Sequence, residues 1–433
     1  MPFAALDLHK KEIQAATYDD QGNPVYRGRF PATRAALEAF ARRHLSVAHK
    51  IAIEATFNTW AIASLLEPYV EEVVVSNPVA TRAIAQAKVK TDKIDTDVLA
   101  HLLRCDYLPR VWIPDEETRR LRHQCTERAN LSSDRTRLKN RIHAVLHQRL
   151  IEAPQGDLFS PANRRWLRSL ALDAPGRATL DRHLRQLDAV ELELEALDTE
   201  FVQHAAAHPQ IKLLMSIPGI DFTIAECIYS TLGDITRFPT PDHAAAYVGL
   251  VPSTHQSGDT CYHGRITKQG RAHARWLLVQ AAQHLSEHPG PLGVFFRRLA
   301  KRKNRNVAVV ATARKIVTIA WHMLTNNEPY RYAIPKASQA KYDRLRIRAT
   351  GQKRKGGIAK GSPRPAAYGS GNPTRGIPSL AQVYADAGLP ELKTAPPGEA
   401  KMLRQEGLDE FAAGLQKPRR VPKKSAAKKK PAQ

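Results

Sequence analysis

Hydrophobic residues in the first eighty positions alternate between short β-type runs and helical spacing. The runs FAALDLH, KEIQAATY and VYRGRF, separated by polar residues and a QGNP turn, predict three antiparallel strands. A helix at 33–44, the strand KIAIEA, a helix at 59–66 and the strand EEVVVSN, which ends before Pro78, follow in order. This order of elements predicts a mixed α/β sheet domain.

Beyond residue 90 the spacing becomes helical. Residues 90–150 are basic and helical, and 176–207 predict one long helix with an apolar seam of Leu180, Leu184, Leu187, Leu194, Leu197 and Phe201. The seam suits an antiparallel coiled coil, a dimer zipper or packing within its own domain. We therefore expect an α/β domain at 1–150, a linker and coiled-coil helix at 151–210, and a mostly α-helical domain at 211–331, with a tail at 332–433.

The positive charge is concentrated in that tail. The chain has 433 residues and a formal net charge of +24, and residues 332–433 hold 22 Lys and Arg against 7 Asp and Glu. Because this segment is also rich in Gly and Pro, composition predicts a disordered basic tail. Its chemistry fits either a solubilising segment or a polyanion-binding one, and we expect nucleic acid to be the partner. The tail lysines expected to contact it are Lys423, Lys424, Lys428, Lys429 and Lys430.

Other features exclude several classes of protein. No run approaches the roughly 20 apolar residues of a membrane span, and the first ten residues lack the apolar core of a secretory signal, so we expect a soluble, cytoplasmic protein without a membrane partner. The four cysteines form no CxxC pair, and we expect them to be buried small hydrophobes. His143 and His147 are four residues apart, but they lack the glutamate of a zinc-protease motif and fit a basic helix face.

Two carboxylates stand out in the strands. Asp7 shares its strand face with Phe3 and Ala5, inside a run that is apolar on both faces. A carboxylate buried there must be paired, protonated or bound to a cation, and Lys10 or Lys11 could supply the pairing. Glu54 ends the strand IAIE, at the carboxyl edge where open α/β sheets form their sites, although exposed glutamates at strand ends are common.

Two more acids lie in the segment KTDKIDTDVLAHLLR. At about 100° per residue, Asp92 and Asp95 fall on the side of the buried leucines, whereas Asp97 faces water. Capping of the helix start explains an acid at Asp92 but not a second one on the apolar side. Together the four acids could hold two Mg²⁺ ions, because oxygen-only ligands select hard cations and a metal pair can assist phosphodiester displacement.

The ordered series ALDLHK, IAIEA and KTDKIDTDVLA, followed by IPGI, LGDITRF, AAYVGLVPS, QSG and ITKQGRAHAR, resembles the DEDD transposases of insertion-sequence family 110. The likeness covers roughly residues 1–330. It implies a RuvC-like N-terminal domain of the ribonuclease H type, with Asp7, Glu54, Asp92 and Asp95 as the metal-binding acids.

The resemblance also implies a second domain with a serine that attacks DNA, and Ser257 occupies the matching position. Ser253 is a rival hydroxyl, and Arg265, Lys268, Arg271 and Arg275 lie downstream to hold phosphate. The family further implies a structured noncoding guide RNA, double-stranded donor and target DNA, and a homo-oligomer in which acids and serine come from different subunits. Asp221 departs from the pattern, because it replaces a glycine of a helix-hairpin-helix turn near Pro218; we expect an ordinary helix turn there.

These observations predict an RNA-guided, Mg²⁺-dependent transposase that mobilises its own insertion sequence and associates with the nucleoid when bound to DNA. One alternative is a metal-only resolvase or nuclease that uses water as the nucleophile. The other is a non-catalytic nucleic-acid scaffold in which the acids are structural.

Overall fold

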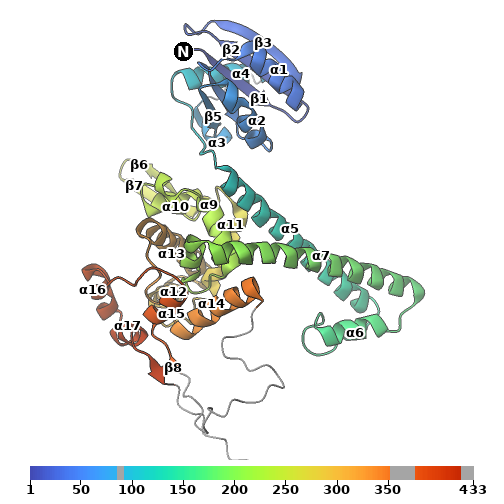
Figure 1. Ribbon diagram of the computed structural model, residues 1–433, viewed down its shortest axis with the longest axis vertical. Coiled ribbons are helices and arrows are strands. Elements are labelled where there is room, and N and C mark those ends of the chain that lie inside the picture. The colour runs from blue at the N-terminus through green and yellow to red at the C-terminus, as the bar shows by residue number, and fades with distance from the viewer. Residues whose placement is uncertain (85–91, 352–375, 421–433) are drawn as a thin grey trace, which may run out of the picture. The chain divides into compact units, whose positions relative to one another are not determined.

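The computed structural model describes residues 1–84, 92–351 and 376–420 and divides the chain into two units, residues 1–115 and 116–433 (Figure 1). We call them unit 1 and unit 2. The division falls after Asp115 rather than at residue 150, because the long helix α5 (Glu116–His147) packs on helices of unit 2.

Unit 1 is built on a five-stranded sheet of order β3-β2-β1-β4-β5. The strands are β1 (Phe3–Leu8), β2 (Glu12–Tyr18), β3 (Pro24–Pro31), β4 (Lys50–Glu54) and β5 (Glu72–Ser76). β1, β2 and β3 are antiparallel, whereas β4 and β5 run parallel to β1. The predicted strands and the mixed α/β class are therefore confirmed.

Helices cover both faces of this sheet. α1 (Arg34–His44) and α2 (Thr59–Leu66) pack on the face that carries Leu6 and Ile53. α4 (Asp92–Arg104) packs on the opposite face, which carries Ala5 and Ala52. A short 3₁₀ turn (Glu67–Tyr69) and α3 (Pro78–Ile84) complete the described part of the unit. Because both faces are covered, every residue of β1 is buried and its sequence reads as one apolar run.

Unit 2 begins with two long helices that pack against each other, α5 and α7 (Ala174–Ala207), joined through α6 (Pro161–Ser169) (Figure 1). The α7 seam residues Leu180, Leu184 and Leu187 lie in one buried cluster with Ile142 and Leu146 of α5. This part of the seam is therefore covered by the chain's own helix, which agrees with packing inside the domain.

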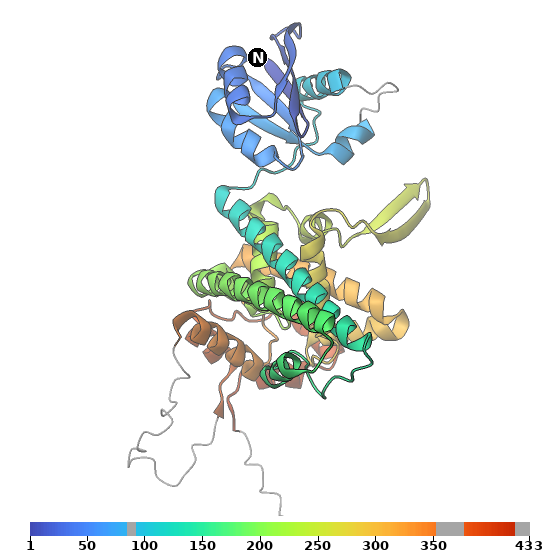
Figure 2. The ribbon, with the colours of Figure 1, turned by 90° about the vertical axis from the view of Figure 1, so that its right-hand side faces the viewer.

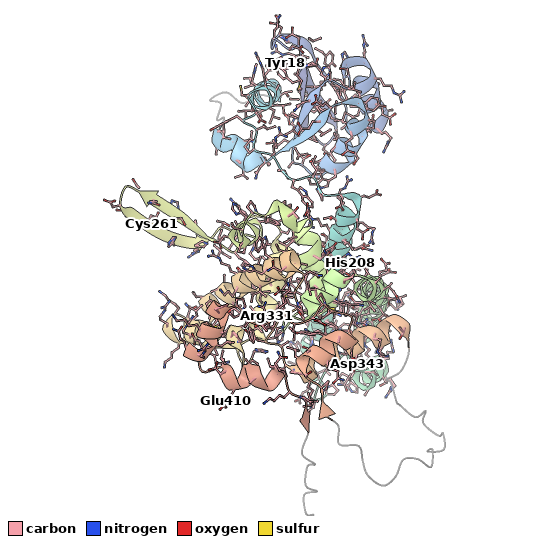
Figure 3. The ribbon with its side chains drawn as sticks, turned by 60° about the vertical axis from the view of Figure 1, so that its left-hand side comes forward. Tyr18, His208, Cys261, Arg331, Asp343 and Glu410 are labelled. Atoms are coloured by element: carbon pink, nitrogen blue, oxygen red, sulfur yellow. The ribbon has the colours of Figure 1, made fainter. Side chains whose placement is uncertain are left out.

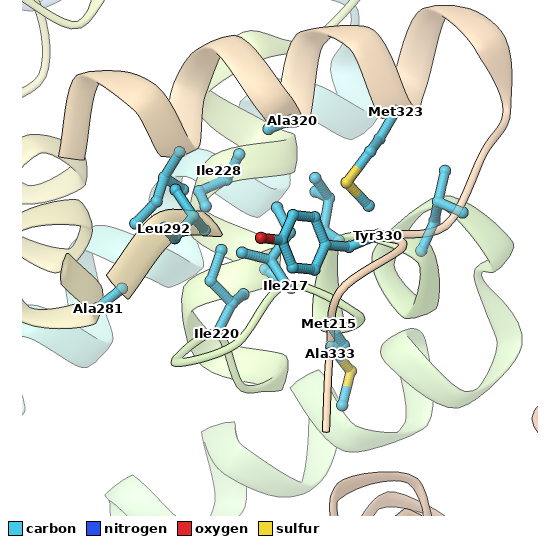
Figure 4. Packing of buried hydrophobic residues seen from close by; sticks show 14 of the residues in the cluster. Met215, Ile217, Ile220, Ile228, Ala281, Leu292, Ala320, Met323, Tyr330 and Ala333 are labelled. Atoms are coloured by element: carbon cyan, nitrogen blue, oxygen red, sulfur yellow. The ribbon is translucent and has the colours of Figure 1, made fainter. Parts of the chain in front are cut away.

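The main core of unit 2 is helical (Figure 4). Its elements are α8 (Pro209–Met215), α9 (Phe222–Leu232), a 3₁₀ turn (Ile235–Arg237), α10 (Pro241–Tyr247), α11 (Ala272–Gln283), α12 (Pro291–Arg302), α13 (Arg305–Asn326), α14 (Pro335–Thr350), α15 (Leu380–Asp386), α16 (Pro397–Gln405) and α17 (Asp409–Leu415). Two short strands, β8 (Gly376–Ile377) and β9 (Arg419–Arg420), pair near the end. The turn before α9 is an ordinary helix start, because Asp221 caps the helix by accepting from Ile224 N at 3.0 Å.

α13 is the one helix in the described residues that is long and apolar enough to cross a membrane by length and composition alone. It packs against α10, α11 and α12 and carries core residues such as Ile316 and Ala320. Its apolar composition is thus accounted for by its place in the core of unit 2.

The prediction of a disordered tail from residue 332 is wrong for residues 332–351 and 376–420. Tyr342, Leu345, Leu380, Tyr384 and Leu403 are buried in the same core as α8 to α13. Residues 352–375 and 421–433 lie outside the described residues, and so do the five tail lysines from Lys423 to Lys430.

The prediction for the cysteines is half right. Cys125 and Cys227 are buried, whereas Cys105 and Cys261 are exposed. Cys261 lies on a hairpin that projects from the body of unit 2 (Figure 3).

Candidate active site

Asp7 and Glu54 stand at the carboxyl ends of neighbouring parallel strands. β1 and β4 pair from Phe3–Lys50 to Leu6–Ile53, so Asp7 and Glu54 are the next residue on each strand. Neighbouring strands lie about 4.8 Å apart, and each acid is two residues beyond an alanine that faces α4. The two acids therefore share the α4 face of the sheet, at the edge where open α/β sheets bind ligands.

Asp7 is a buried carboxylate with a histidine beside it. The residue is 9% exposed, and its Oδ2 lies 3.2 Å from Nε2 of His9. Lys10 and Lys11, the partners considered from sequence, are exposed. Burial of this group reduces its hydration, so a cation at the site would compensate its charge.

Glu54 is half-buried and is followed by a tight turn. The Thr59 hydroxyl lies 3.3 Å from the Glu54 carbonyl oxygen, and Thr56 N donates to that hydroxyl at 2.6 Å. These contacts fix the path of the chain as it leaves β4 for α2. The backbone that carries the Glu54 carboxylate is thereby held in place.

α4 covers the face that carries these acids, with Leu99 and Ala100 packed in one cluster with Ala5 and Ala52. The Arg104 guanidinium lies 5.9 Å from the centroid of the Phe3 ring, so this side chain at the end of α4 reaches the start of β1. Asp95 is half-buried and lies one turn before the buried Leu99. Asp95 thus belongs to the helix that packs on the Asp7 and Glu54 side of the sheet.

The other acids of α4 differ in their surroundings. Asp92 opens the helix, but its side chain lies outside the described residues. Asp97, predicted to face water, instead accepts hydrogen bonds from the Tyr18 hydroxyl and from Arg27 Nη2 at 3.0 Å. Burial and the hydrogen bond to Asp97 raise the pKa of Tyr18. Asp97 therefore links α4 to β2 and β3 through these hydrogen bonds.

The donor chemistry of this edge fits a hard divalent cation. Asp7, Glu54 and Asp95 offer carboxylate oxygens, the ligands that such ions prefer. Among the described side chains, however, no group of three or more His, Cys, Asp or Glu residues is close enough to hold a metal ion. The side chain of Asp92, one turn before Asp95, lies outside the described residues.

Ser257 is at the tip of an exposed β-hairpin in unit 2. β6 (Pro252–Ser257) and β7 (Thr260–Ile266) are antiparallel, with Ser257 opposite Thr260 and a turn at Gly258, whose φ is +56° (Figure 2). All residues from Thr254 to Arg265 are exposed. A two-stranded ribbon exposed on both faces is marginally stable by itself, so this geometry suits a segment that docks on a partner.

One face of the hairpin carries both candidate serines. Ser253, His255 and Ser257 alternate along β6 on the same side, and the His255 ring stacks on Tyr262 with centroids 5.0 Å apart. Ser253 lies at the base, where a Cβ on Gly264 would come within 2.4 Å of its Oγ. Ser257 is therefore the accessible hydroxyl, and Ser253 is packed against the opposite strand.

Two glycines at the base of the hairpin allow close backbone contacts with the core. Gly249 has φ +69°, and a Cβ there would lie 2.4 Å from the carbonyl oxygen of Gln269. Gly270 also has φ +69°, and its Cβ would lie 2.1 Å from the carbonyl oxygen of Tyr247. These close backbone approaches require glycine and set the direction in which the hairpin leaves the core.

The basic residues downstream divide into two groups. Arg265 and Lys268 are exposed and open to a ligand. Arg275 Nη1 donates to the carbonyl oxygens of Val248 and Gln269 at 3.1 and 2.9 Å, and Arg271 Nη2 lies 3.2 Å from Thr126 Oγ1. Burial, together with nearby Arg122, lowers the pKa of Arg271. Arg271 and Arg275 thus have structural contacts that the sequence did not indicate.

A buried ion pair in unit 2 was also missed from the sequence. Glu226 of α9 is fully buried, and its Oε1 lies 2.7 Å from Nδ1 of His204 in α7. Burial raises the pKa of Glu226, and the hydrogen bond to Glu226 raises the pKa of His204. The available signal was an acid within the apolar run IAECI.

Comparison with known proteins relates both units to transposases. A family model described as "Transposase IS116/IS110/IS902 family" matches residues 211–294, and the model for DEDD proteins of IS110 elements, described as "Transposase", matches residues 4–150. The transposase of insertion sequence IS1111A from Coxiella burnetii is 30% identical over 217 residues, 47% of this chain and 58% of the relative.

Two further relatives cover more of the chain. The IS1328 transposase from Yersinia enterocolitica is 25% identical over 332 residues, 74% of this chain and 96% of the relative. The pilin gene-inverting protein of Moraxella bovis is 26% identical over 290 residues, 64% of this chain and 80% of the relative. The chain spans about half the length of several other curated relatives that it matches.

Proposed function

The chain belongs to the IS110 family of transposases, and from this premise we propose that it cleaves and exchanges DNA strands to mobilise an insertion sequence. The substrates are double-stranded donor and target DNA, and a structured noncoding RNA guides the choice of site. The working assembly is a homo-oligomer that acts in the cytoplasm, on the nucleoid.

One observation carries the catalytic part of this proposal. Asp7 and Glu54 end adjacent parallel strands on one face of the sheet, and Asp95 belongs to the helix that covers this face. Carboxylates at the carboxyl ends of parallel strands offer the oxygen ligands that hard cations prefer, at the edge where open α/β sheets bind ligands. This placement supports a cation site.

We propose that Asp7, Glu54, Asp92 and Asp95 hold Mg²⁺. When bound, the ion stabilises the negative charge that develops on the phosphate oxygens. The chain's own contribution is rigidity, because β1, β4 and α4 fix the backbone of the three described acids.

Ser257 is the proposed nucleophile. Its Oγ forms a bond to the phosphorus, the bond from phosphorus to one sugar oxygen breaks, and the serine proton ends on the freed sugar hydroxyl. The product is a phosphoserine joined to one DNA end, which the hydroxyl of another strand attacks in the reverse reaction. The exposed position of Ser257 at the hairpin tip supports this role, and Arg265 and Lys268 lie close in sequence to bind phosphate.

Covalent trapping tests the proposal. Purified protein is incubated with Mg²⁺, guide RNA and labelled DNA, then denatured, and the protein–DNA adduct is measured on a gel. Ser257→Ala and Asp7→Asn should both abolish the adduct, whereas Ser253→Ala, the matched control, should retain it. Chelation by EDTA should abolish it reversibly.

Two results would contradict the roles assigned here. Unchanged DNA cleavage in Ser257→Ala, still dependent on Asp7, would identify a metal-dependent nuclease that uses water. An intact set of DNA products from Asp7→Asn would mean that the acids are structural.

A further inference from the structure

The segment between Glu287 and Glu328 contains no acidic residue. These forty positions form the helical pair α12 and α13 with their junction, and they include eight Lys and Arg. Such a one-sided composition in a folded helical pair differs from an ordinary solvated surface, where both signs are interspersed. The distribution of partners within the chain shows which of these charges are used for folding.

Three of the eight basic residues have structural partners. Arg297 donates to the carbonyl oxygens of Ser286 and His288 at 2.9 Å, Arg298 pairs with Glu406, and Arg314 pairs with Asp242. These contacts join α12 and α13 to neighbouring segments of unit 2. They account for these residues without a ligand.

Four of the remaining five charges lie at the junction of the two helices, and the fifth is Lys315 in the middle of α13. Lys301, Arg302, Lys303 and Arg305 are all exposed, and none of them forms an ion pair with the described part of the chain. We call these four residues the basic junction. Arg305 lies 5.8 Å from the centroid of the Phe296 ring, a contact with no negative charge in it.

Helix electrostatics explain only half of the basic junction. Lys301 and Arg302 occupy the last turn of α12, where the dipole favours cations. Arg305 occupies the first position of α13, where the dipole disfavours a cation, and Lys303 lies between the helices. In addition, Lys301 and Arg302 stand four residues after Arg297 and Arg298, which places like charges side by side. Helix electrostatics and ion pairs within the described residues therefore do not account for the whole charge of the basic junction.

We propose that the basic junction binds the phosphate backbone of the DNA duplex on which the protein acts. Four unpaired cations within five residues suit a row of phosphates, since each contact releases condensed counterions. The exposed stretch 301–307 contains no aromatic side chain, so it lacks the stacking surface that single-stranded RNA binding requires. This proposal rests on the proposed function in one respect only, namely that the bound duplex is the DNA that the protein cleaves.

The test compares two variants of equal charge. In the first, Lys301, Arg302, Lys303 and Arg305 are all changed to Gln. In the control, four exposed arginines of α5, α6 and α7 that form no ion pair with the described residues are changed to Gln instead: Arg141, Arg165, Arg182 and Arg185. Thermal melting by circular dichroism verifies that both variants remain folded. Binding to a 30-base-pair DNA duplex is then measured by fluorescence anisotropy across a salt series.

The junction variant should flatten the slope of log K against log salt by about 3, and its affinity at 0.15 M salt should fall on the order of 10- to 100-fold. The control should change the slope by less than about 1. Equal losses in both variants would mean that only net charge matters, and an unchanged slope in the junction variant would mean that these four residues do not contact phosphates; either overturns the proposal. Because the acids and Ser257 are untouched, adduct formation at saturating DNA should persist, which separates this test from that of the proposed function.

Discussion

Replacing Gly249 by alanine should misplace the serine hairpin. Two effects add at this position. An alanine in the left-handed region costs about 1 kcal/mol relative to glycine. The new Cβ would also lie 2.4 Å from the Gln269 carbonyl oxygen and 2.5 Å from Gln269 N, whereas ordinary contacts begin near 3.4 Å. Backbone at the hairpin base must therefore move by about 1 Å, at a further cost of about 1–3 kcal/mol.

Gly388→Ala is the matched control, because Gly388 has φ +73° in the same unit but no atom within 4 Å of a new Cβ. A unit of this size loses about 2 °C in melting temperature per kcal/mol. We expect a loss of about 4–8 °C for Gly249→Ala and about 2 °C for Gly388→Ala, measured by calorimetry.

The same pair of variants separates stability from positioning. At a temperature where both remain folded, Gly249→Ala should slow covalent adduct formation on the order of 100-fold, because a 1 Å displacement of a reacting group is enough to do so. Gly388→Ala should react at the wild-type rate. Equal melting temperatures and equal rates for the two variants would refute the conclusion that Gly249 sets the direction in which the hairpin leaves the core.

Other predictions concern the core, pH and subunits. Leu187→Ala should lower the free energy of unfolding by about 2–5 kcal/mol, measured by urea unfolding, and should leave the oligomeric state unchanged by light scattering. Leu192→Ala, at a site 71% exposed on the same helix, should change neither quantity appreciably. The pKa of His204 is raised in the folded protein by its hydrogen bond to Glu226. The stability that this pair contributes is therefore full below about pH 6.5 and is lost as the pH rises through the folded-state pKa of His204. Glu226→Gln should accordingly destabilise the protein most at pH 6 and least at pH 8. If acids and serine act from different subunits, mixing Asp7→Asn with Ser257→Ala should restore adduct formation, and a mixture as inactive as its components would count against it.

Unit 1 could be predicted because its signals are local. β1 and β2 alternate or run apolar over their whole length, and Pro78 follows β5, so the strands could be predicted in their order along the chain. The pairing of β1 with β4, which places Asp7 beside Glu54, was not predicted, because it joins strands that are far apart in the sequence. The surroundings of Asp97 could not be predicted either, because they depend on where Tyr18 and Arg27 meet α4, and helix periodicity carries no information on those distances.

The tail shows where composition misleads. Residues 332–433 are rich in Gly, Pro and Lys, yet Leu380, Val383 and Tyr384 recur at helical spacing and are buried. Their burial depends on a surface formed by α8 and α14, which no local window contains. In the same way, the structural contacts of Arg271 and Arg275 depend on the Thr126 hydroxyl and the Val248 carbonyl oxygen, which are distant in sequence.

The core of unit 2 joins Val202 to Leu415. A ribosome adding about 5–20 residues per second needs on the order of 10–40 s to synthesise the intervening stretch. Throughout that interval the nascent chain exposes apolar helices whose partners have not yet been made. A premature stop codon late in the reading frame would consequently release an incompletely packed polypeptide, suited to degradation and chaperone capture rather than a shortened working enzyme.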